Sequence, residues 1–372
     1  MLFFDLKKIN GRYADELKRA ASEVIDSGRY IRGGAVERFE DELSAFTGCR
    51  YAIGTGNGLD ALRLILKAYM ELGIMAPGDE VILPANTFIA TLLAVADNGL
   101  KPVITDIDPE TMNLDTELAE KAITSRTKAI IPVHLYGNCC WDGRLRDIAL
   151  NRGIKIVEDN AQAIGATSDT DGINGGRTAG HLGHASGISF YPAKNLGALG
   201  DCGAVTTDDP LLADTVRALG NYGSTRKYVH EYMGLNSRMD EMQAAFLSVK
   251  MKYLDADNKI RRGIASVYGR CIRAGEVKKP APHNGRCVWH QYVIRTSERD
   301  GLQRFLAENG VETMIHYPTP LHRHEACREY SHLHLPVAEK YAGEILSLPI
   351  SPVMTHADAE YVSDLINRFF GA

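Results

Sequence analysis

Short apolar runs and helical patterns alternate along the chain from residue 51 onward. The runs are apolar on both faces, as expected for central strands that helices cover on each side. They lie at residues 51–53, 80–83, 102–104, 129–133, 154–157, 187–190 and 203–206. This alternation predicts an α/β layered domain, and the polar or glycine residues that end several runs mark the edge where ligands bind in such sheets.

The pattern changes between residues 239 and 262, where apolar positions at helical spacing predict one long connecting helix. Strand patterns at 289–294 and 311–315 then flank a helical pattern at 302–306, and a terminal helix follows. We therefore expect a large α/β domain at residues 1–245 and a small C-terminal α+β domain at residues 246–372.

The composition excludes several classes of partner. The chain has 372 residues, 45% of them hydrophobic, and a formal net charge of −5, which offers no basic surface to nucleic acid. No apolar run is long enough to span a bilayer, and charges interrupt the N-terminus too early for a secretory signal. The seven cysteines form no Cys-x-x-Cys pair, which favours reduced thiols and a cytoplasmic protein with no membrane partner.

A glycine-rich turn at residues 54–62 follows a strand pattern and opens a helical one. Backbone amides and the positive end of a helix can hold a phosphate in such a turn. The dinucleotide fingerprint Gly-x-Gly-x-x-Gly would need glycine at Leu59 or Ala61, so the sequence disfavours an NAD site. A turn without any ligand is the remaining alternative.

An aspartate and a lysine follow two of the apolar runs. Asp159 ends a strand pattern, where a carboxylate is costly to bury unless it meets a cation or hydrogen-bond donors. Lys194 lies in a loop after the run at 187–190. Pyridoxal phosphate needs these two groups, because an amine can hold its aldehyde as an imine and a carboxylate can keep its pyridine nitrogen protonated. Taken singly, a helix-capping aspartate and a solvated lysine are the alternatives.

Three further side chains lie in or just after strand patterns of the same region. Phe88 could stack on a flat ring, Gln162 could reach a ring hydroxyl, and Ser189 could bond a phosphate oxygen. Each has an ordinary alternative as a core ring, a turn cap or a satisfied core serine. The order of glycine turn, aromatic, aspartate, glutamine, serine and lysine favours the cofactor.

The segments around these residues resemble one known family nearly from end to end. They are residues 27–33, 56–62, 87–91, 132–137, 158–162, 189–197, 234–241 and 316–322. In them the chain is similar to the DegT/DnrJ/EryC1/StrS sugar aminotransferases. The resemblance implies the aspartate aminotransferase fold of type I, in which a large mixed-sheet α/β domain binds pyridoxal phosphate and a smaller α+β domain follows.

The resemblance also implies roles for residues that match the family motifs. Lys194 looks like the Schiff-base lysine, Asp159 the pyridinium partner, Gln162 the contact to the ring oxygen and Phe88 the stacking ring. The phosphate would be bound by Gly58, Leu59 and Ser189, and by Asn236 from the neighbouring subunit of a homodimer with shared active sites. The residues that look like the substrate side of the pocket are Tyr30, Gly33, His316, Tyr317 and His322.

The implied reaction is amino transfer from glutamate to a dTDP-linked 3-keto-6-deoxyhexose, giving a 3-amino-3,6-dideoxyhexose for surface polysaccharide. Amination at carbon 4 of a dTDP- or UDP-linked sugar is the close alternative. An NAD-dependent sugar oxidoreductase and a non-catalytic binding module are remote ones. Departures from the family pattern at Ile164, His184, Cys202 and residues 169–176 leave the cofactor groups intact and bear on substrate specificity.

Histidines are frequent near the C-terminus but match no zinc spacing and lack cysteine or carboxylate partners in register. They are His316, His322, His324, His332 and His334. We therefore predict no metal site.

Overall fold

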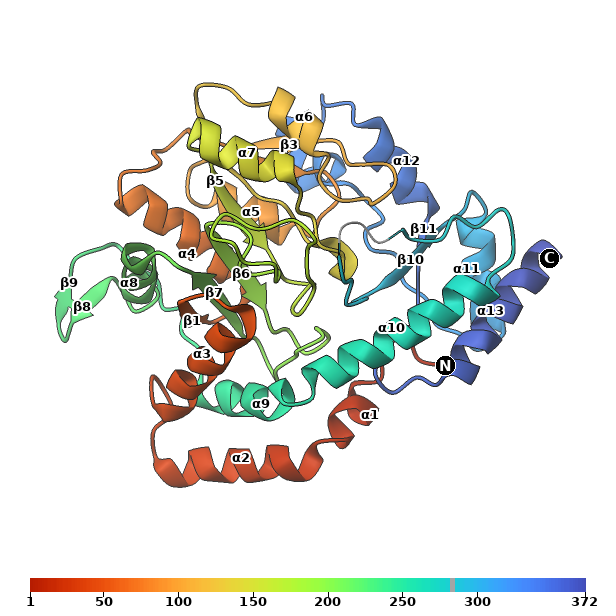
Figure 1. The fold of residues 1–372 in the computed structure, drawn as a ribbon, viewed down its shortest axis with the longest axis horizontal. Helices are drawn as coiled ribbons and strands as arrows, with labels where there is room; N and C mark the ends of the chain where they lie inside the picture. Colours follow the sequence, from red (N-terminus) through yellow and green to blue (C-terminus); the bar gives the residue numbers. More distant parts are fainter. Residues whose placement is uncertain (282–284) are drawn as a thin grey trace.

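The computed structural model describes residues 1–281 and 285–372, and a seven-stranded mixed sheet forms its centre (Figure 1). The strand order is β1-β7-β6-β5-β4-β2-β3. β7 runs antiparallel to both of its neighbours, β1 and β6, whereas the other pairs are parallel. The bounds are β1 (Tyr51–Thr55), β2 (Glu80–Pro84), β3 (Lys101–Thr105), β4 (Thr127–Ile130), β5 (Lys155–Asp159), β6 (Ala185–Ser189) and β7 (Gly203–Thr207).

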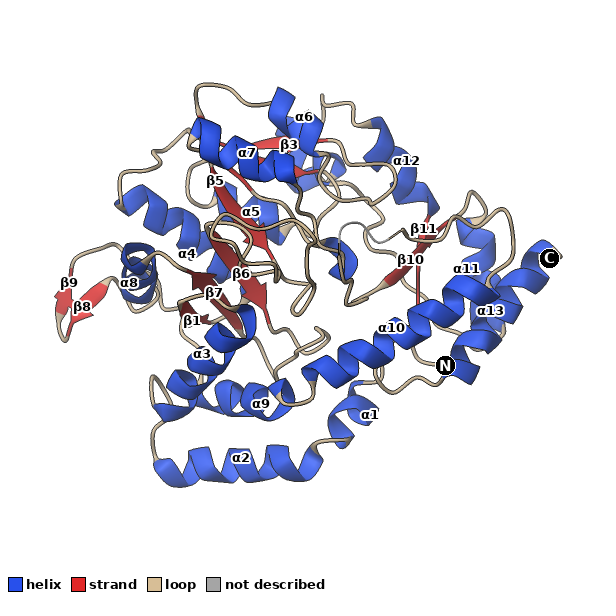
Figure 2. Ribbon diagram, viewed as in Figure 1, coloured by secondary structure: helices blue, strands red, loops and turns tan. Residues whose placement is uncertain are grey.

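Helices cover both faces of this sheet (Figure 2). In β2, Val81 and Leu83 join the apolar cluster of α4 and α5, while Ile82 joins the cluster of α7 on the opposite face. This is the reason why the strand is apolar throughout, and it confirms the α/β prediction. The helices are α1 (Leu6–Gly11), α2 (Ala14–Ser27), α3 (Gly34–Thr47), α4 (Gly58–Glu71), α5 (Ala90–Ala96), α6 (Thr116–Lys121), α7 (Gly143–Arg152) and α8 (Pro210–Leu219).

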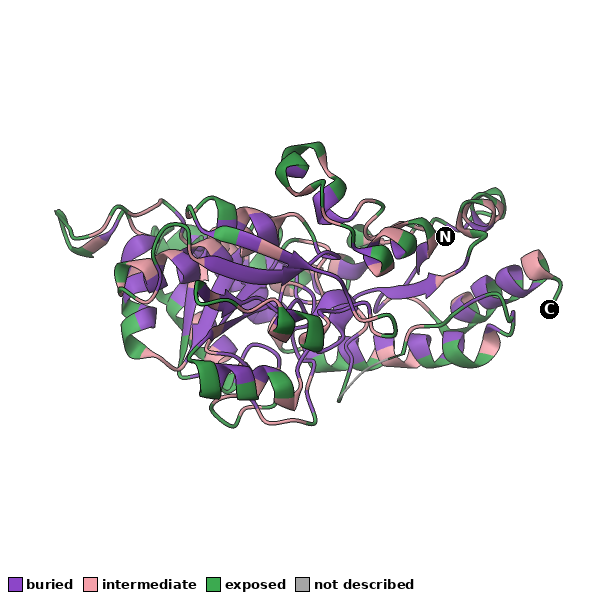
Figure 3. Cartoon of the chain, turned by 90° about the horizontal axis from the view of Figure 1, so that it is seen from above, coloured by how far each residue is buried: buried purple, intermediate pink, exposed green. Residues whose placement is uncertain are grey.

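The C-terminal part has its own two-stranded antiparallel sheet and its own apolar cluster. Figure 3 shows buried positions concentrated in the strands and on the inner sides of the helices. The elements of this part are α10 (Leu254–Cys271), β10 (Tyr292–Arg295), α11 (Arg299–Glu308), α12 (Pro336–Glu344), β11 (Ile345–Leu348) and α13 (His356–Phe370), with short 3₁₀ turns η2 (Leu321–Arg323) and η3 (Glu325–Tyr330).

The long helix predicted for residues 239–262 is two helices, so that part of the prediction is wrong. α9 (Glu241–Met251) ends before Tyr253, and α10 begins after it. The ring of Tyr253 stacks on that of Tyr13 with centroids 4.8 Å apart, which fixes the break against the N-terminal helices. The predicted domain boundary at residue 245 falls inside α9 and stays a prediction.

Strand ends and helix starts meet at one edge of the large sheet. β5 ends at Asp159, β6 ends at Ser189, and α4 begins at Gly58 just after β1. Because β5 and β6 are parallel, their carboxyl ends lie together, which is the edge where α/β sheets bind ligands.

Two smaller elements complete the large part of the chain. A turn η1 (Leu135–Gly137) follows β4, and a small hairpin of β8 (Ser224–Arg226) and β9 (Val229–His230) projects from the body (Figure 1).

None of the helices in the described residues is both long enough and apolar enough to cross a membrane.

Candidate active site

A cavity of about 450 Å³ opens at this edge of the sheet. It is lined by every residue predicted to bind the cofactor except Asn236, namely Gly58, Leu59, Phe88, Asp159, Gln162, Ser189 and Lys194. Leu62, Tyr191 and Tyr317 also line it. The structure therefore brings together predicted residues from five separate segments of the chain.

Asp159 reaches the cavity because neighbouring residues of a strand point to opposite faces. Glu158 points the other way and is fully buried, where its carboxylate accepts hydrogen bonds from His134 at 2.8 Å and from the backbone amides of Gly180, Leu182 and Gly183. These bonds hold the end of β5 in place. Asp159 is thus presented to the cavity by a strand that its neighbour anchors.

The carboxylate of Asp159 has two hydrogen-bond donors. Thr91 donates to Oδ2 at 2.7 Å, and the amide of Ala161 donates to Oδ1 at 3.2 Å. Burial raises the pKa of Asp159 above its ordinary value, while these hydrogen bonds act in the opposite direction. A cation beside the carboxylate would compensate for the burial, and a protonated pyridine nitrogen is such a cation.

Thr91 was not identified from the sequence, although it lies in a segment that carried the resemblance. It is fully buried on α5, and its hydroxyl lies 2.7 Å from that of Thr87. Thr87 precedes the helix, so the spacing of the two threonines along the sequence does not indicate that their hydroxyls meet. Only the fold shows that Thr91 meets Asp159.

Lys194 is in the loop between β6 and β7. Burial lowers its pKa from 10.5 to about 8, and the charge of Asp159 opposes that shift. A substantial fraction of the amine is therefore neutral near pH 8, which is the form that attacks an aldehyde and accepts a proton.

The other end of the cavity is the start of α4. The first amides of a helix have no partners within the helix. Asn57 accepts from the amide of Asp60 with its side chain at 2.8 Å and from that of Ala61 with its carbonyl at 3.1 Å. This leaves the amides of Gly58 and Leu59 without a partner among the described residues. A Cβ on Gly58 would lie 2.5 Å from the Cβ of Ser189, so only glycine lets the helix start approach that serine. Free amides, the positive end of the helix and a serine hydroxyl are the donors that a phosphate requires.

Gln162 and Phe88 both contact Tyr317. The Gln162 side chain accepts from the amide of Tyr136 at 2.6 Å and donates to the Tyr317 hydroxyl at 3.1 Å. The Phe88 ring is 57% exposed, with its centroid 5.7 Å from that of Tyr317. Phosphate donors at one end, a buried carboxylate, an amine and an exposed aromatic ring together fit pyridoxal phosphate.

The remaining predicted residues lie outside this cavity. Asn236 is exposed and pairs with Asn221 in an isolated bridge. The His316 imidazole lies 2.8 Å from the Ser347 hydroxyl, and that of His322 is fully buried 2.9 Å from Glu339. Of the five residues predicted to bind substrate, Tyr317 is the one that lines the cavity.

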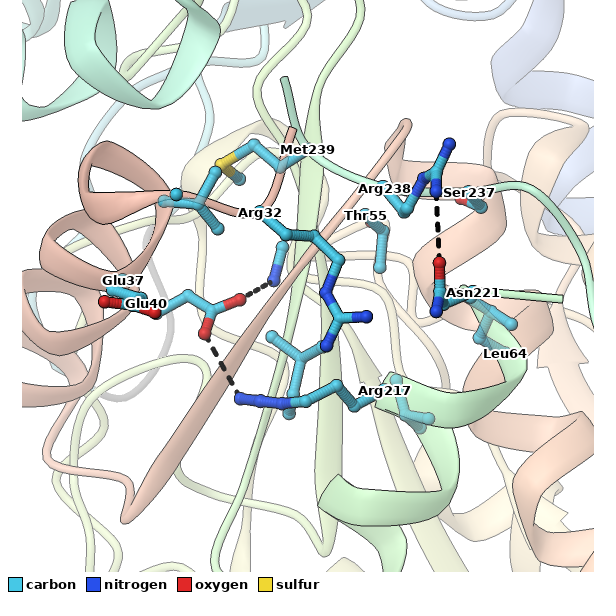
Figure 4. A pocket seen from close by; sticks show the side chains of 16 residues that line it. Arg32, Glu37, Glu40, Thr55, Leu64, Arg217, Asn221, Ser237, Arg238 and Met239 are labelled. Carbon is cyan, nitrogen blue, oxygen red and sulfur yellow. Dashed lines mark hydrogen bonds and ion pairs between the residues drawn. The ribbon is translucent and has the colours of Figure 1, made fainter. Parts of the chain in front are cut away.

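Gly33 lines a second cavity of about 440 Å³, and Tyr30 is an exposed residue just before it in the chain. The sequence did not predict this cavity, whose lining includes three arginines (Figure 4). Arg217 is paired with Glu40 at 3.1 Å, and Figure 4 shows the side chain of Arg32 extending toward Arg217. The predicted substrate residues at 30–33 therefore lie beside a charged cavity of three arginines and two glutamates, which Lys194 of the same chain does not line.

One group of residues in the described parts of the chain has metal-ligating side chains within 4.8 Å of one another: Cys49, His181 and Asp208. Each already has a partner, since the Cys49 thiol donates to the Gly180 carbonyl at 2.9 Å and the His181 ring lies 2.8 Å from Asp208. These bonds account for the cluster without an ion, and the prediction of no metal site stays a prediction.

The lowered pKa of Lys194 predicts how cofactor uptake varies with pH. The neutral fraction of the amine increases as the pH rises, so the rate at which apoenzyme captures pyridoxal phosphate should rise with a midpoint at about pH 8 and level off above it. Absorbance after rapid mixing measures this rate. Pyridoxamine phosphate, which has no aldehyde, is the control and should lack this step. A rate that keeps rising toward 10.5, the ordinary lysine value, would contradict the assignment.

Comparisons with known proteins agree with this geometry. The sequence profile of the DegT/DnrJ/EryC1/StrS aminotransferase family matches residues 12–367. A dTDP-3-amino-3,6-dideoxy-alpha-D-galactopyranose transaminase from Aneurinibacillus thermoaerophilus is 46% identical over 368 residues, covering 99% of this chain and 99% of that protein.

Two solved structures are similar over the whole chain. DesV from S. venezuelae has a TM-score of 0.93 at 41% identity, covering 100% of this chain and 98% of that one. The protein ntda from Bacillus subtilis, solved with its cofactor PMP bound, has a TM-score of 0.90 at 32% identity, covering 100% of this chain and 85% of that one. These similarities confirm the predicted aminotransferase fold.

Proposed function

Because the chain belongs to the DegT/DnrJ/EryC1/StrS aminotransferase family, we propose that it transfers an amino group from glutamate to a dTDP-linked 3-keto-6-deoxyhexose. The enzyme is an aminotransferase that uses pyridoxal phosphate. The product would be a 3-amino-3,6-dideoxyhexose for surface polysaccharide. The single observation that carries the choice of carbon 3 is the full-length 46% identity to a transaminase whose named sugar bears its amino group there.

Pyridoxal phosphate, when bound, supplies an electron-withdrawing ring that stabilises negative charge on the carbon that loses a proton. Lys194 Nζ would first hold the cofactor and then, once released, move the proton to and from the substrate carbon. Its lowered pKa suits both directions of that transfer near neutral pH. The oxygens of Asp159, oriented by Thr91 and Ala161, would keep the proton on the ring nitrogen.

The other residues of the cavity would hold and orient the cofactor and the substrate. Gly58, Leu59 and Ser189 would bind the phosphate, Phe88 would stack on the ring, and Gln162 would contact the ring oxygen. The substrate side would include Tyr317, which lines the cavity, and by the family motifs also Tyr30, Gly33, His316 and His322, which lie outside it in the single chain. These assignments follow the family motifs.

We further propose a homodimer in which Asn236 completes the phosphate site of the neighbouring subunit. Asn236 does not line the cavity of its own chain, which is what we expect of a residue that serves the site of a neighbouring subunit. Tyr228 and Met233, in and just after the projecting β8–β9 hairpin, are 85% and 84% exposed, and exposed apolar groups of this kind mark surfaces that a partner covers. All seven cysteines lie among the described residues and none forms a disulfide, which supports a cytoplasmic location.

Separate incubations test which carbon is aminated. The purified enzyme with glutamate should convert dTDP-3-keto-6-deoxyglucose with a kcat/KM about 10²-fold or more above that for the 4-keto isomer, since the two sugars must be turned differently to present their carbonyls. Product identification by mass spectrometry and NMR measures this. Turnover of the 4-keto sugar alone would overturn the choice of carbon 3.

Mixed dimers test the shared site. A Lys194→Ala dimer and an Asn236→Ala dimer should each have little activity, but unfolding and refolding them together should restore about a quarter of wild-type activity, because half of the dimers are hybrid and each hybrid has one intact site. Mixing two samples of the same variant is the control. If hybrids stay inactive while the subunits demonstrably exchange, Asn236 serves the site of its own chain.

A further inference from the structure

A buried lysine contacts the loop that carries Lys194. Lys250 is on α9 and is only 6% exposed. Its ammonium group donates to the backbone carbonyl of Gly197 and to Oδ1 of Asn10, the latter at 3.1 Å. In the described parts of the chain it forms no ion pair with a carboxylate. A buried cation without such a pair is costly, so its placement calls for an explanation.

The loop between β6 and β7 is folded tightly around its contact with Lys250. The amide of Ala198 donates to the carbonyl of Phe190 at 2.8 Å, which closes the loop, and the amide of Lys194 donates to the carbonyl of Tyr191 at 2.8 Å. A Cβ on Gly197 would collide with the carbonyl of Pro192, so the loop has no room to adjust there. The bond to Lys250 therefore fixes the backbone three residues after Lys194.

The same loop is anchored at neighbouring positions from two helices. On α9, Gln243 accepts from the amide of Leu199 at 2.9 Å, and it lies seven residues, or two helical turns, before Lys250 on the same face. From the α10 side, Asn258 accepts from the Asn195 amide group at 2.8 Å. Lys250 is the charged member of this set, and hydrogen bonds from charged donors are the stronger ones.

We propose that Lys250 is a positioning residue for Lys194, whose ammonium group fixes the loop backbone so that the Lys194 amine stays directed into the cofactor cavity. The proposal rests on the function proposed above for Lys194. Burial lowers the pKa of Lys250 to about 8, with Asp257 acting against that shift, which is consistent with a cation held by neutral oxygens. Asp257 itself is bonded to Arg12 at 2.7 Å and to the Tyr13 hydroxyl at 2.5 Å.

Substitutions at position 250 separate this role from a merely structural one. Lys250→Met keeps the length and apolar stem but removes the donors, while Lys250→Gln restores a neutral donor. Lys252→Met, at an exposed lysine just after the same helix, is the control. The readouts are the melting temperature, the dissociation rate of the cofactor from the holoenzyme, the visible absorbance of the bound cofactor as a function of pH, and kcat and KM.

We expect Lys250→Met to melt near the wild-type temperature. Its cofactor should dissociate about tenfold to a hundredfold faster and its kcat should fall by a similar factor, because the reacting amine is displaced. KM for the sugar nucleotide should not change. The pH at which the visible absorbance of the bound cofactor changes should also shift in Lys250→Met. Lys250→Gln should recover part of each loss, and Lys252→Met should match wild type.

A folded Lys250→Met enzyme with wild-type cofactor dissociation, absorbance titration and kcat would overturn the proposal. So would losses that follow the melting temperature equally in the Met and Gln variants, because they would indicate a structural role only. A wild-type protein that takes up no cofactor would instead contradict the proposed function itself, so the two failures can be told apart.

Discussion

Replacing Lys194 with alanine is expected to reduce the rate of transamination by about 10³-fold or more, because the amine that is removed both holds the cofactor and moves the proton. Lys194 lines the cavity that Asp159 and the start of α4 share, and its lowered pKa makes its amine reactive near pH 8. Formation of aminosugar from the ketosugar and glutamate measures the loss. The visible absorbance that wild-type enzyme shows with pyridoxal phosphate should disappear as well.

The matched control is Lys252→Ala, because the Lys252 side chain is exposed and does not line the cavity. It should retain wild-type turnover and absorbance. Small amines added to the Lys194→Ala enzyme should restore part of the turnover, since a free amine can take over the proton transfer that the side chain performed. If Lys194→Ala converts ketosugar at the wild-type rate, the mechanism assigned to this site is wrong.

Replacing Asp159 with asparagine is expected to lower kcat by about 10² to 10³-fold, comparable to the loss of one preorganised electrostatic contact in other enzymes. Asparagine has nearly the same shape, and its carbonyl oxygen can still accept from Thr91. It has no charge with which to keep a proton on the ring nitrogen. The loss should appear in kcat and in the absorbance of the bound cofactor, while KM for the sugar nucleotide changes little.

A companion variant shows whether the charge or the shape matters. Thr91→Val removes one donor to Asp159 but leaves the carboxylate, so its effect should be smaller than that of Asp159→Asn and in the same direction. Circular dichroism and the melting temperature check that both variants are folded. Equal activity in wild type and Asp159→Asn would show that the carboxylate does not face the ring nitrogen.

The cofactor side of the site could be predicted from the sequence because its residues stand at strand ends. Asp159 and Ser189 end parallel strands, and the pattern of apolar runs by itself indicates that such ends share one edge of the sheet. Gly58 was found in the same way, from a glycine turn between a strand and a helix. The local pattern was sufficient because the topology of such sheets is strongly constrained.

The substrate side was harder to predict for a physical reason. His322 belongs to a family motif, yet its imidazole is buried against Glu339, which no periodicity indicates. Thr91 and Lys250 act through contacts with segments 68 and 53 residues away, and such pairings depend on the packed fold. The break at Tyr253 was missed for the same reason, since its cause is a ring from the N-terminal helices.

The reversed direction of β7 has a consequence for how the protein folds. Because β6 and β7 are adjacent and antiparallel, Lys194 lies in a hairpin connection, and its loop can close as soon as these two strands meet. Asp159 reaches the same cavity only through the parallel pairing of β5 with β6, which requires a longer crossover and forms more slowly. The loop should therefore close early during folding, whereas the Lys194 amine should reach its final direction only when α9 and α10 pack against that loop.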